Sequence, residues 1–328
     1  MTAMPLIDLP APRQPHVTVT RDHDPGLLDV DAATIIELYK KHGALLFRGF
    51  GIDVAAFRAF AQQFCSTSVV NESPGRQPID PDSHIFSVDA GTRAFPLHPE
   101  LSREPWKPDV AFFGCLSAPG QGGKTTICDG VALVEALPPQ LRESLAQRRL
   151  LYIQSTWPSL LKFWLGTATP TDAQLARPPE GCPYQFRRFP QGIARIFSRP
   201  ALHKPMFADA PAFGNFLLFA RALGHSDSVV LDDGRPMPEP WVEAIGAAAD
   251  RLTVPIDWQA GDLLMLDNTR FMHGRTEITD PGERLIMTYF GYLACAIPDS
   301  DEPPNAIWRR VNFEPPRRDE NRDYRATA

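Results

Sequence analysis

The sequence contains no apolar run of the roughly 18 residues that a membrane-crossing helix requires. Its first residues are interrupted by prolines and by Asp8, so we expect no secretory signal peptide. The five cysteines form no Cys-x-x-Cys pair, which a zinc ribbon or a disulfide scaffold would show. We therefore expect buried, reduced thiols and a cytoplasmic protein.

An excess of basic residues is also missing. Lys and Arg number 33 against 39 Asp and Glu, which gives a formal net charge of −6 and argues against a nucleic-acid partner. The hydrophobic share of 43% and the charged share of 22% are ordinary for a globular chain, so disorder is excluded. We expect one domain over 1–328, with a core at about 30–298 and a tail at 299–328. The expected partner is a small-molecule substrate, with no membrane partner; the oligomeric state is left open.

Prolines, by contrast, are abundant, at 34 of 328 residues, and they favour short strands joined by loops. Helical spacing predicts few helices, at 32–42, from 54 to 64 after Asp53, at 131–148 and at 239–250. The remaining apolar runs predict an antiparallel sandwich or barrel. Residues 166–192 read as a long loop, and the tail from Pro303 is expected to wrap the surface or fray. The expected strands are 44–50, 84–88, 110–119, 124–130, 149–155, 192–198, 251–258, 262–268 and 284–296.

Two segments place an acid two residues after a histidine, and in a strand both side chains of such a pair share a face and can chelate one ion. His225-Ser226-Asp227 lies in a polar stretch that predicts a solvated turn. His98-Pro99-Glu100 follows an apolar segment and precedes the strand-rich region. Because proline cannot donate a ladder hydrogen bond, this second pair is expected at the edge or end of a strand.

A third histidine supports a metal site at the His98–Glu100 pair. His273 follows an expected strand at 262–268, and Arg284 comes eleven positions later. Two histidines and one carboxylate are the ligand set of Fe(II) sites that leave positions open for other ligands. An arginine nearby can hold the far carboxylate of a 2-oxo acid through two parallel hydrogen bonds.

Three segments, PLHPELS at 96–102, GQGGKTTICDG at 120–130 and WQAGDLLMLDNTRFMHGR at 258–275, resemble the TauD/TfdA family of Fe(II)- and 2-oxoglutarate-dependent dioxygenases. The similarity extends from about 44 to 290 and is nearest to the clavaminate-synthase-like branch, which uses Glu as a ligand. The resemblance implies a single, mostly β domain with flanking helices, built as a double-stranded β-helix (a cupin-like jelly roll). It implies an enzyme that uses Fe(II), 2-oxoglutarate as cosubstrate and O2.

The resemblance also implies roles for particular residues. The metal ligands and catalytic residues are His98, Glu100 and His273. Arg284 and Thr125, from Gly122-Gly123-Lys124-Thr125, match the positions that bind the distal carboxylate of 2-oxoglutarate. Arg275 lies where it could touch either the cosubstrate or a neighbouring carboxylate. Five further family positions are interpreted as scaffold: Trp258, Gly261, Asp262, Asp267 and Asn268.

The implied reaction is hydroxylation of an unactivated C–H bond, with release of succinate and CO2. Glu100 argues against halogenation, because halogenating relatives have a small residue there. Thr288 stands where sulfonate-specific members have a second arginine, which argues against a sulfonate substrate. Desaturation, epoxidation and cyclisation in natural-product biosynthesis use the same triad and remain alternatives. Two alternative hypotheses do not involve 2-oxoglutarate: the protein is a cupin-like metalloenzyme, or it is a metal-free β-sandwich binding protein.

The segments 70–97 and 157–200 are expected to shape the substrate pocket, as they do in the family. The favoured substrate is a small polar metabolite, derived from an amino acid as in that branch. We expect its contacts among a set of arginines and aromatic residues. The alternative interpretation is that the arginines are surface charges and the aromatic residues belong to the core. The candidates are Arg76, Arg187, Arg188, Arg195, Arg199, Phe95, Trp157, Phe163 and Trp164.

Overall fold

The computed structural model describes residues 5–22, 26–71, 73, 75–280, 284–311 and 313–317. Within these residues the main sheet has nine strands, all antiparallel except for the pairing of β2 with β3. The order across the sheet begins at the N-terminal hairpin, and β4 (Cys65–Ser68) pairs with β17 off this path. The other strands, in order, are β1 (Leu6–Asp8), β2 (Val17–Thr20), β3 (Ala44–Arg48), β15 (Leu263–Asp267), β8 (Val110–Ser117), β17 (Leu285–Leu293), β6 (Ile85–Ser87) and β5 (Pro78–Asp80).

A second antiparallel sheet packs against one face of the main sheet. Phe113 and Leu264 of the main sheet share a buried core with Ile127 and Phe271 of the second sheet. Their neighbours Phe112 and Met265 face the opposite side, toward the helices, because successive side chains of a strand alternate. Both faces of the main sheet are thus covered, which explains its continuous apolar runs. The second sheet consists of β14 (Val254–Pro255), β9 (Thr125–Asp129), β16 (Phe271–Arg275) and β7 (Phe95–His98).

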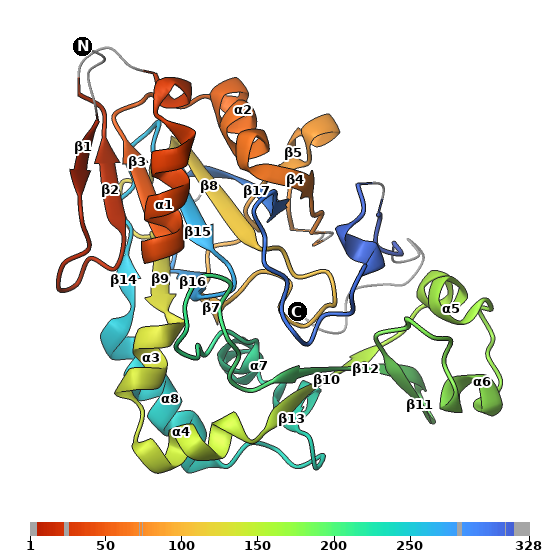
Figure 1. The fold of residues 1–328 in the computed structure, drawn as a ribbon. Coiled ribbons are helices and arrows are strands. Elements are labelled where there is room, and N and C mark those ends of the chain that lie inside the picture. Colours follow the sequence, from red (N-terminus) through yellow and green to blue (C-terminus); the bar gives the residue numbers. More distant parts are fainter. Residues whose placement is uncertain are drawn as a thin grey trace.

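Two helices, α1 (Ala32–His42) and α2 (Val54–Phe64), cover the outer face of the main sheet (Figure 1). Asp31 and Asp53 begin them, because each carboxylate accepts a hydrogen bond from a backbone N–H of the first turn. Gly43 ends α1 with a left-handed backbone, as expected. A third core lies around α3 (Gly130–Ala136), α4 (Pro139–Ala146), α7 (Leu217–Ala222) and α8 (Glu239–Leu252).

The third sheet extends away from the two packed sheets together with α5 (Pro158–Leu165) and α6 (Asp172–Ala176) (Figure 1). Short 3-10 turns complete the described elements at Leu27–Asp29, Pro81–Ser83, Ser226–Ser228 and Ile307–Arg309. The strands of the third sheet are β11 (Gln185–Phe189), β12 (Gly192–Pro200), β10 (Arg149–Ser155) and β13 (Val229–Leu231).

Two expected elements were wrong. The helix expected at 131–148 is divided between α3 and α4, because Pro138 and Pro139 lack the N–H groups that a continuous helix needs. The loop expected at 166–192 contains α6 and β11 instead. In that segment Thr171 and Gln174 form a reciprocal cap, and β11 pairs with β12. The segment is short in apolar residues, so periodicity did not reveal either element.

The C-terminal tail lies on the body of the protein over its described part. Trp308 is 4% exposed, and Arg309 forms ion pairs with Asp109 and Glu302. The expectation that the tail wraps the surface is confirmed up to 317, and residues 318–328 lie outside the described residues. All five cysteines are free thiols, two of them fully buried. No helix in the described ranges is long and apolar enough to cross a membrane.

Candidate active site

His98, Glu100 and His273 meet at one end of the second sheet. His98 is the last residue of β7, and His273 lies opposite it on β16. Glu100 lies in the turn that follows, so the expected position at a strand end is confirmed. Because β7 ends at His98, Pro99 and Glu100 lie outside the strand. One ligand atom from each of the three side chains lies within 4.8 Å of the other two.

Both imidazoles are prepared to act as neutral ligands. His98 Nδ1 donates to the carbonyl of Pro96 at 2.8 Å, which fixes the tautomer and leaves Nε2 with its lone pair. Nε2 of His273 lies 3.7 Å from Oε2 of Glu100, and the two rings are 4.5 Å apart between centroids. Burial lowers the pKa of His98, and burial with the nearby His98 and Arg76 holds the pKa of His273 well below its usual value.

This donor set fits a divalent iron. The three residues are 7% exposed or less, and they offer two nitrogen donors and one carboxylate from one side. A buried carboxylate between two neutral imidazoles is stabilised by a cation, and two histidines with one carboxylate are the ligand set of non-haem Fe(II) oxygenases.

The turn that carries Glu100 is held by Asn268, which is fully buried. Its amide oxygen accepts from the backbone N–H of Glu100 at 2.7 Å. Its amide nitrogen donates to the carbonyls of Glu100 at 3.1 Å and Pro108 at 2.8 Å. Asn268 was interpreted from the sequence as scaffold, and its contacts show that it fixes the backbone of the candidate carboxylate ligand.

We expect Asn268→Ala to lower the free energy of unfolding by about 2–4 kcal/mol, because three buried backbone groups lose their partners. It should also weaken Fe(II) binding about tenfold or more, since Glu100 loses its support. Asn215→Ala is the matched control. Asn215 is equally buried but bonds to Ala201 and Leu217. Urea unfolding and equilibrium Fe(II) titration measure both quantities, and equal Fe(II) affinity in the two variants would contradict the role given to Asn268.

Two side chains from the loop before β5 hold the Glu100 carboxylate. Asn71 donates to Oε1, and Nη2 of Arg76 donates to Oε2 at 3.1 Å. Nη1 of Arg76 also donates to Thr288 Oγ1 at 2.9 Å. Arg76 was considered for a substrate anion, and Thr288 marks the place of the missing second arginine. The guanidinium of Arg76, which comes from a different segment, therefore contacts both Thr288 and the candidate ligand Glu100.

A cavity beside the triad is lined by three arginines, Arg76, Arg275 and Arg284. Among the described residues Arg284 has no carboxylate within ion-pair distance, and its Nε donates to the carbonyl of Gly123 at 2.6 Å. Burial and repulsion from Arg275 lower the pKa of Arg284 to about 10, so it stays charged at neutral pH. Such a concentration of positive charge fits a dicarboxylate. The cavity also contains Val88, Asp89, Phe95, His98, Phe113, Thr125, His273 and Gly274.

The open volume of this cavity is only about 40 Å³, so side chains on its wall must move to admit 2-oxoglutarate. Arg284 has the greatest freedom to do so, because among the described residues a single side-chain hydrogen bond holds it. Thr125 begins β9 at the same wall. Its hydroxyl oxygen accepts from Nε1 of Trp258 at 3.0 Å, which leaves its proton available for a carboxylate.

The two glycines before Thr125 are required by this arrangement. Gly122 and Gly123 both have left-handed backbones. A Cβ on Gly122 would lie 2.2 Å from the carbonyl oxygen of Glu277, and one on Gly123 would lie 2.8 Å from Cδ of Arg284. Gly122 thus allows the backbone of Glu277 to approach, and Gly123 allows the Arg284 side chain to lie directly against the backbone two residues before Thr125.

Arg275 is held differently from Arg284. It ends β16, and its guanidinium donates to the carbonyls of Asp89, Gly91 and Arg93 at 2.7–3.0 Å. The expected alternatives were the cosubstrate or a carboxylate. The structure shows backbone carbonyls as its partners, together with a position on the cavity wall.

The remaining sequence candidates lie away from the triad or are engaged elsewhere. Arg195 is completely buried, and its ion pair with Glu104 at 2.6 Å excludes it as a surface charge. Arg188 pairs with Asp172 on the surface. Phe95 is brought to the site, where its ring lies 5.2 Å from that of His98. His225 is exposed at the turn around Ser226–Ser228, as expected. Trp164 is core, Phe163 is half exposed, and Arg187 is exposed.

Residues 12–289 match the sequence model of the family described as "Taurine catabolism dioxygenase TauD, TfdA family". The chain belongs to this family and is a dioxygenase. Fe(II), 2-oxoglutarate and O2, expected from the resemblance, agree with this membership.

Three proteins illustrate what the chain is similar to. A "Clavaminate synthase-like protein" of Arabidopsis thaliana is 26% identical over 271 residues, 76% of this chain and 82% of that protein. The PvcB protein of Pseudomonas aeruginosa superposes with a TM-score of 0.57 at 15% identity, over 87% of this chain and 88% of its own. PvcB is elsewhere described as "an Fe, alpha-ketoglutarate dependent oxygenase from an isonitrile synthetic pathway". A taurine dioxygenase of Burkholderia xenovorans gives 0.56 at 14% identity, over 90% and 94%. These structures confirm the expected jelly-roll fold.

Proposed function

We propose that this protein is an Fe(II)- and 2-oxoglutarate-dependent oxygenase that hydroxylates an unactivated C–H bond of a small polar metabolite. In this proposal His98, Glu100 and His273 bind the iron. Arg284 and Thr125 bind the distal carboxylate of 2-oxoglutarate, and Arg275 supports the wall of the same cavity. The observation that carries the proposal is the position of Arg284, which has no ion pair with any described residue, and of the Thr125 hydroxyl beside a buried His/Glu/His cluster.

The chain's own residues perform binding, orientation and exclusion of water in this reaction. When bound, Fe(II) with 2-oxoglutarate and O2 supplies the oxidising power, and succinate and CO2 are released. His98 and His273 stay neutral through burial, so each offers a lone pair. Arg76 and Asn71 hold the carboxylate of Glu100 in one orientation. Phe95 and Phe113 flank the imidazoles and keep water out.

The position of Arg76 is the evidence for a polar substrate. Its guanidinium is 7% exposed, lines the cavity and contacts Glu100, so an anionic or hydrogen-bonding group of a substrate would meet it next to the iron. We keep an amino-acid-derived metabolite as the favoured class. Desaturation, epoxidation and cyclisation remain the alternative outcomes, because they need the same residues. Screening metabolites for succinate release identifies the substrate.

The proposal is tested without the substrate. Adding Fe(II) and 2-oxoglutarate to the purified protein without oxygen should produce a visible charge-transfer band, because the cosubstrate must coordinate the iron through its 2-oxo acid group. Succinate, which lacks the 2-oxo group, serves as the control and should give no band. A protein that binds Fe(II) but stays colourless with saturating 2-oxoglutarate would support the cupin-like alternative, and one that binds neither would support a metal-free binding protein.

A further inference from the structure

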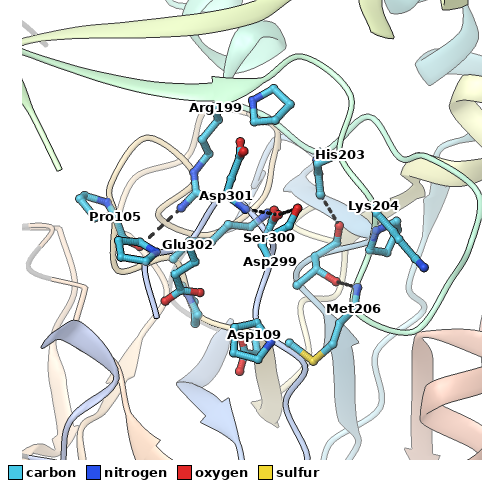
Figure 2. Close-up of a pocket in the computed structure, with 18 of the residues that line it drawn as sticks. Pro105, Asp109, Arg199, His203, Lys204, Met206, Asp299, Ser300, Asp301 and Glu302 are labelled. Atoms are coloured by element: carbon cyan, nitrogen blue, oxygen red, sulfur yellow. Dashed lines mark hydrogen bonds between the residues drawn. The ribbon is translucent and has the colours of Figure 1, made fainter. Parts of the chain in front are cut away.

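A second and much larger cavity lies behind the turn that carries Glu100. Its volume is about 450 Å³, within the range of small-molecule pockets. It shares no lining residue with the cosubstrate cavity. Two residues of its wall are linked to Asn268: the carbonyl of Pro108 accepts a hydrogen bond from the Asn268 amide, and Thr269 follows Asn268 in the chain. The cavity is formed mainly by the segments 105–109, 197–206 and 297–303 (Figure 2).

Most charged side chains on this wall already have an ionic partner. Lys204 pairs with Asp209 at 2.9 Å, and Figure 2 shows its side chain at the rim, pointing away from the acidic segment 299–302. Of the acids, Asp301 pairs with Arg149, and Arg309 is shared between Glu302 and Asp109.

Two cations on the wall lack such a partner. In the described part of the chain, Lys107 forms no hydrogen bond and no ion pair through its ammonium. Arg199 donates Nη2 to the carbonyls of Glu104 and Pro105, and its buried Nε has no acceptor. Among the described residues, one carboxylate on the wall, Asp299, has no cationic partner, and it accepts hydrogen bonds from its neighbours Ser300 and Asp301. Because Arg309 is shared by two carboxylates, the charges around the cavity balance overall, and the positive charge is concentrated locally at Lys107 and Arg199.

The electrostatics of Lys107 agree with a missing counter-ion. Burial and then Arg199 lower its pKa to about 7. The more distant acids Asp267, Asp299 and Asp109 act in the opposite direction without restoring the usual value. An anion placed next to the ammonium would raise this pKa again.

We propose that this cavity binds a small molecule bearing a carboxylate or phosphate group, held by Lys107 and Arg199. His203 adds specificity. Its Nε2 donates to the carbonyl of Thr269 at 2.6 Å, which leaves Nδ1 as an acceptor for a ligand donor. Met206, Ile297 and Trp308 supply apolar wall. The ligand is therefore an organic anion with an apolar part, and the site is separate from the one that binds 2-oxoglutarate.

The test uses protein saturated with Fe(II) and 2-oxoglutarate under anaerobic conditions, so that further stabilisation arises elsewhere. The probes are benzoate, phenyl phosphate and inorganic phosphate, at constant ionic strength. At about 100 times its Kd, a binding probe should raise the melting temperature by about 4 °C. Wild type and Lys204→Gln should respond alike, because Lys204 is already paired, whereas Lys107→Gln should not respond. A response to benzoate alone identifies a carboxylate, and a response to the phosphates alone identifies a phosphate.

A second measurement avoids any folding defect of Lys107→Gln. Reductive methylation of wild-type protein near pH 7.5 should modify the amine of Lys107 readily, and a probe at about 10 times its Kd should slow this about tenfold by occupying the site. Lys204 is the internal control and should keep its rate. Stabilisation that is the same in Lys107→Gln, or no probe protecting Lys107, would overturn the proposal. Neither result depends on the identity of the catalysed reaction.

Discussion

Replacing Glu100 with alanine should abolish turnover and weaken Fe(II) binding by at least about 100-fold, because the change removes a proposed metal ligand and losses at supporting residues alone reach that size. Two neutral imidazoles would remain, next to Arg76, which would have lost one of its two carboxylate partners. The buried charge of Arg76, paired then only with Asp89 at 3.6 Å among the described residues, would oppose a dication more strongly. Anaerobic Fe(II) titration and succinate release under saturating substrate measure the two effects.

The matched variants are Glu100→Asp and Glu100→Gln. Aspartate keeps the negative charge one methylene further from the metal and should retain part of the Fe(II) affinity. Glutamine keeps the shape, including the contacts of the turn with Asn268, but offers no charge, so it should behave like alanine. Full turnover in Glu100→Ala would remove Glu100 from the coordination sphere. Equal behaviour of all three variants would show that the fold, and not the carboxylate, had been damaged.

The triad could be predicted from sequence because each of its members sits in a local pattern. Pro99 places His98 and Glu100 at a strand end, and His273 follows a run of apolar residues that forms β15. The pairing of His273 with His98 could not be predicted from local sequence, because residues 99–270, 172 in all, separate the end of β7 from the start of β16. The resemblance to a known family supplied that connection.

The residues that support the triad were harder to find. Asn71 and Arg76 lie in a polar, proline-rich segment without periodicity, so nothing in their neighbourhood indicates that they reach Glu100. In the sequence Arg76 is one of several arginines that could bind a substrate anion. The role of Asn268 depends on hydrogen bonds to a turn more than 150 residues away, and such contacts are a property of the folded chain. Sequence patterns predict ligands more readily than they predict what holds the ligands.

Replacing Arg284 with glutamine should raise the KM for 2-oxoglutarate by roughly 150-fold while leaving Fe(II) affinity unchanged. Arg284 is a charged donor in a cavity of low exposure, and the loss of a charge-assisted bidentate contact to a carboxylate costs about 3 kcal/mol. No metal ligand contacts Arg284 within the described residues, so the iron should not respond. Arg284→Lys keeps the charge but not the paired donors, and an intermediate KM is expected.

Arg187→Gln is the control for a general loss of positive charge, since Arg187 is exposed on β11. Its KM for 2-oxoglutarate should equal that of wild type. The decisive comparison is between two affinities in Arg284→Gln. A large loss for 2-oxoglutarate alone supports a clamp on the distal carboxylate, whereas a parallel loss of Fe(II) means that Arg284 maintains the cavity as a whole. In that second case the cosubstrate would have to be held by Arg76 or Arg275, which line the same wall.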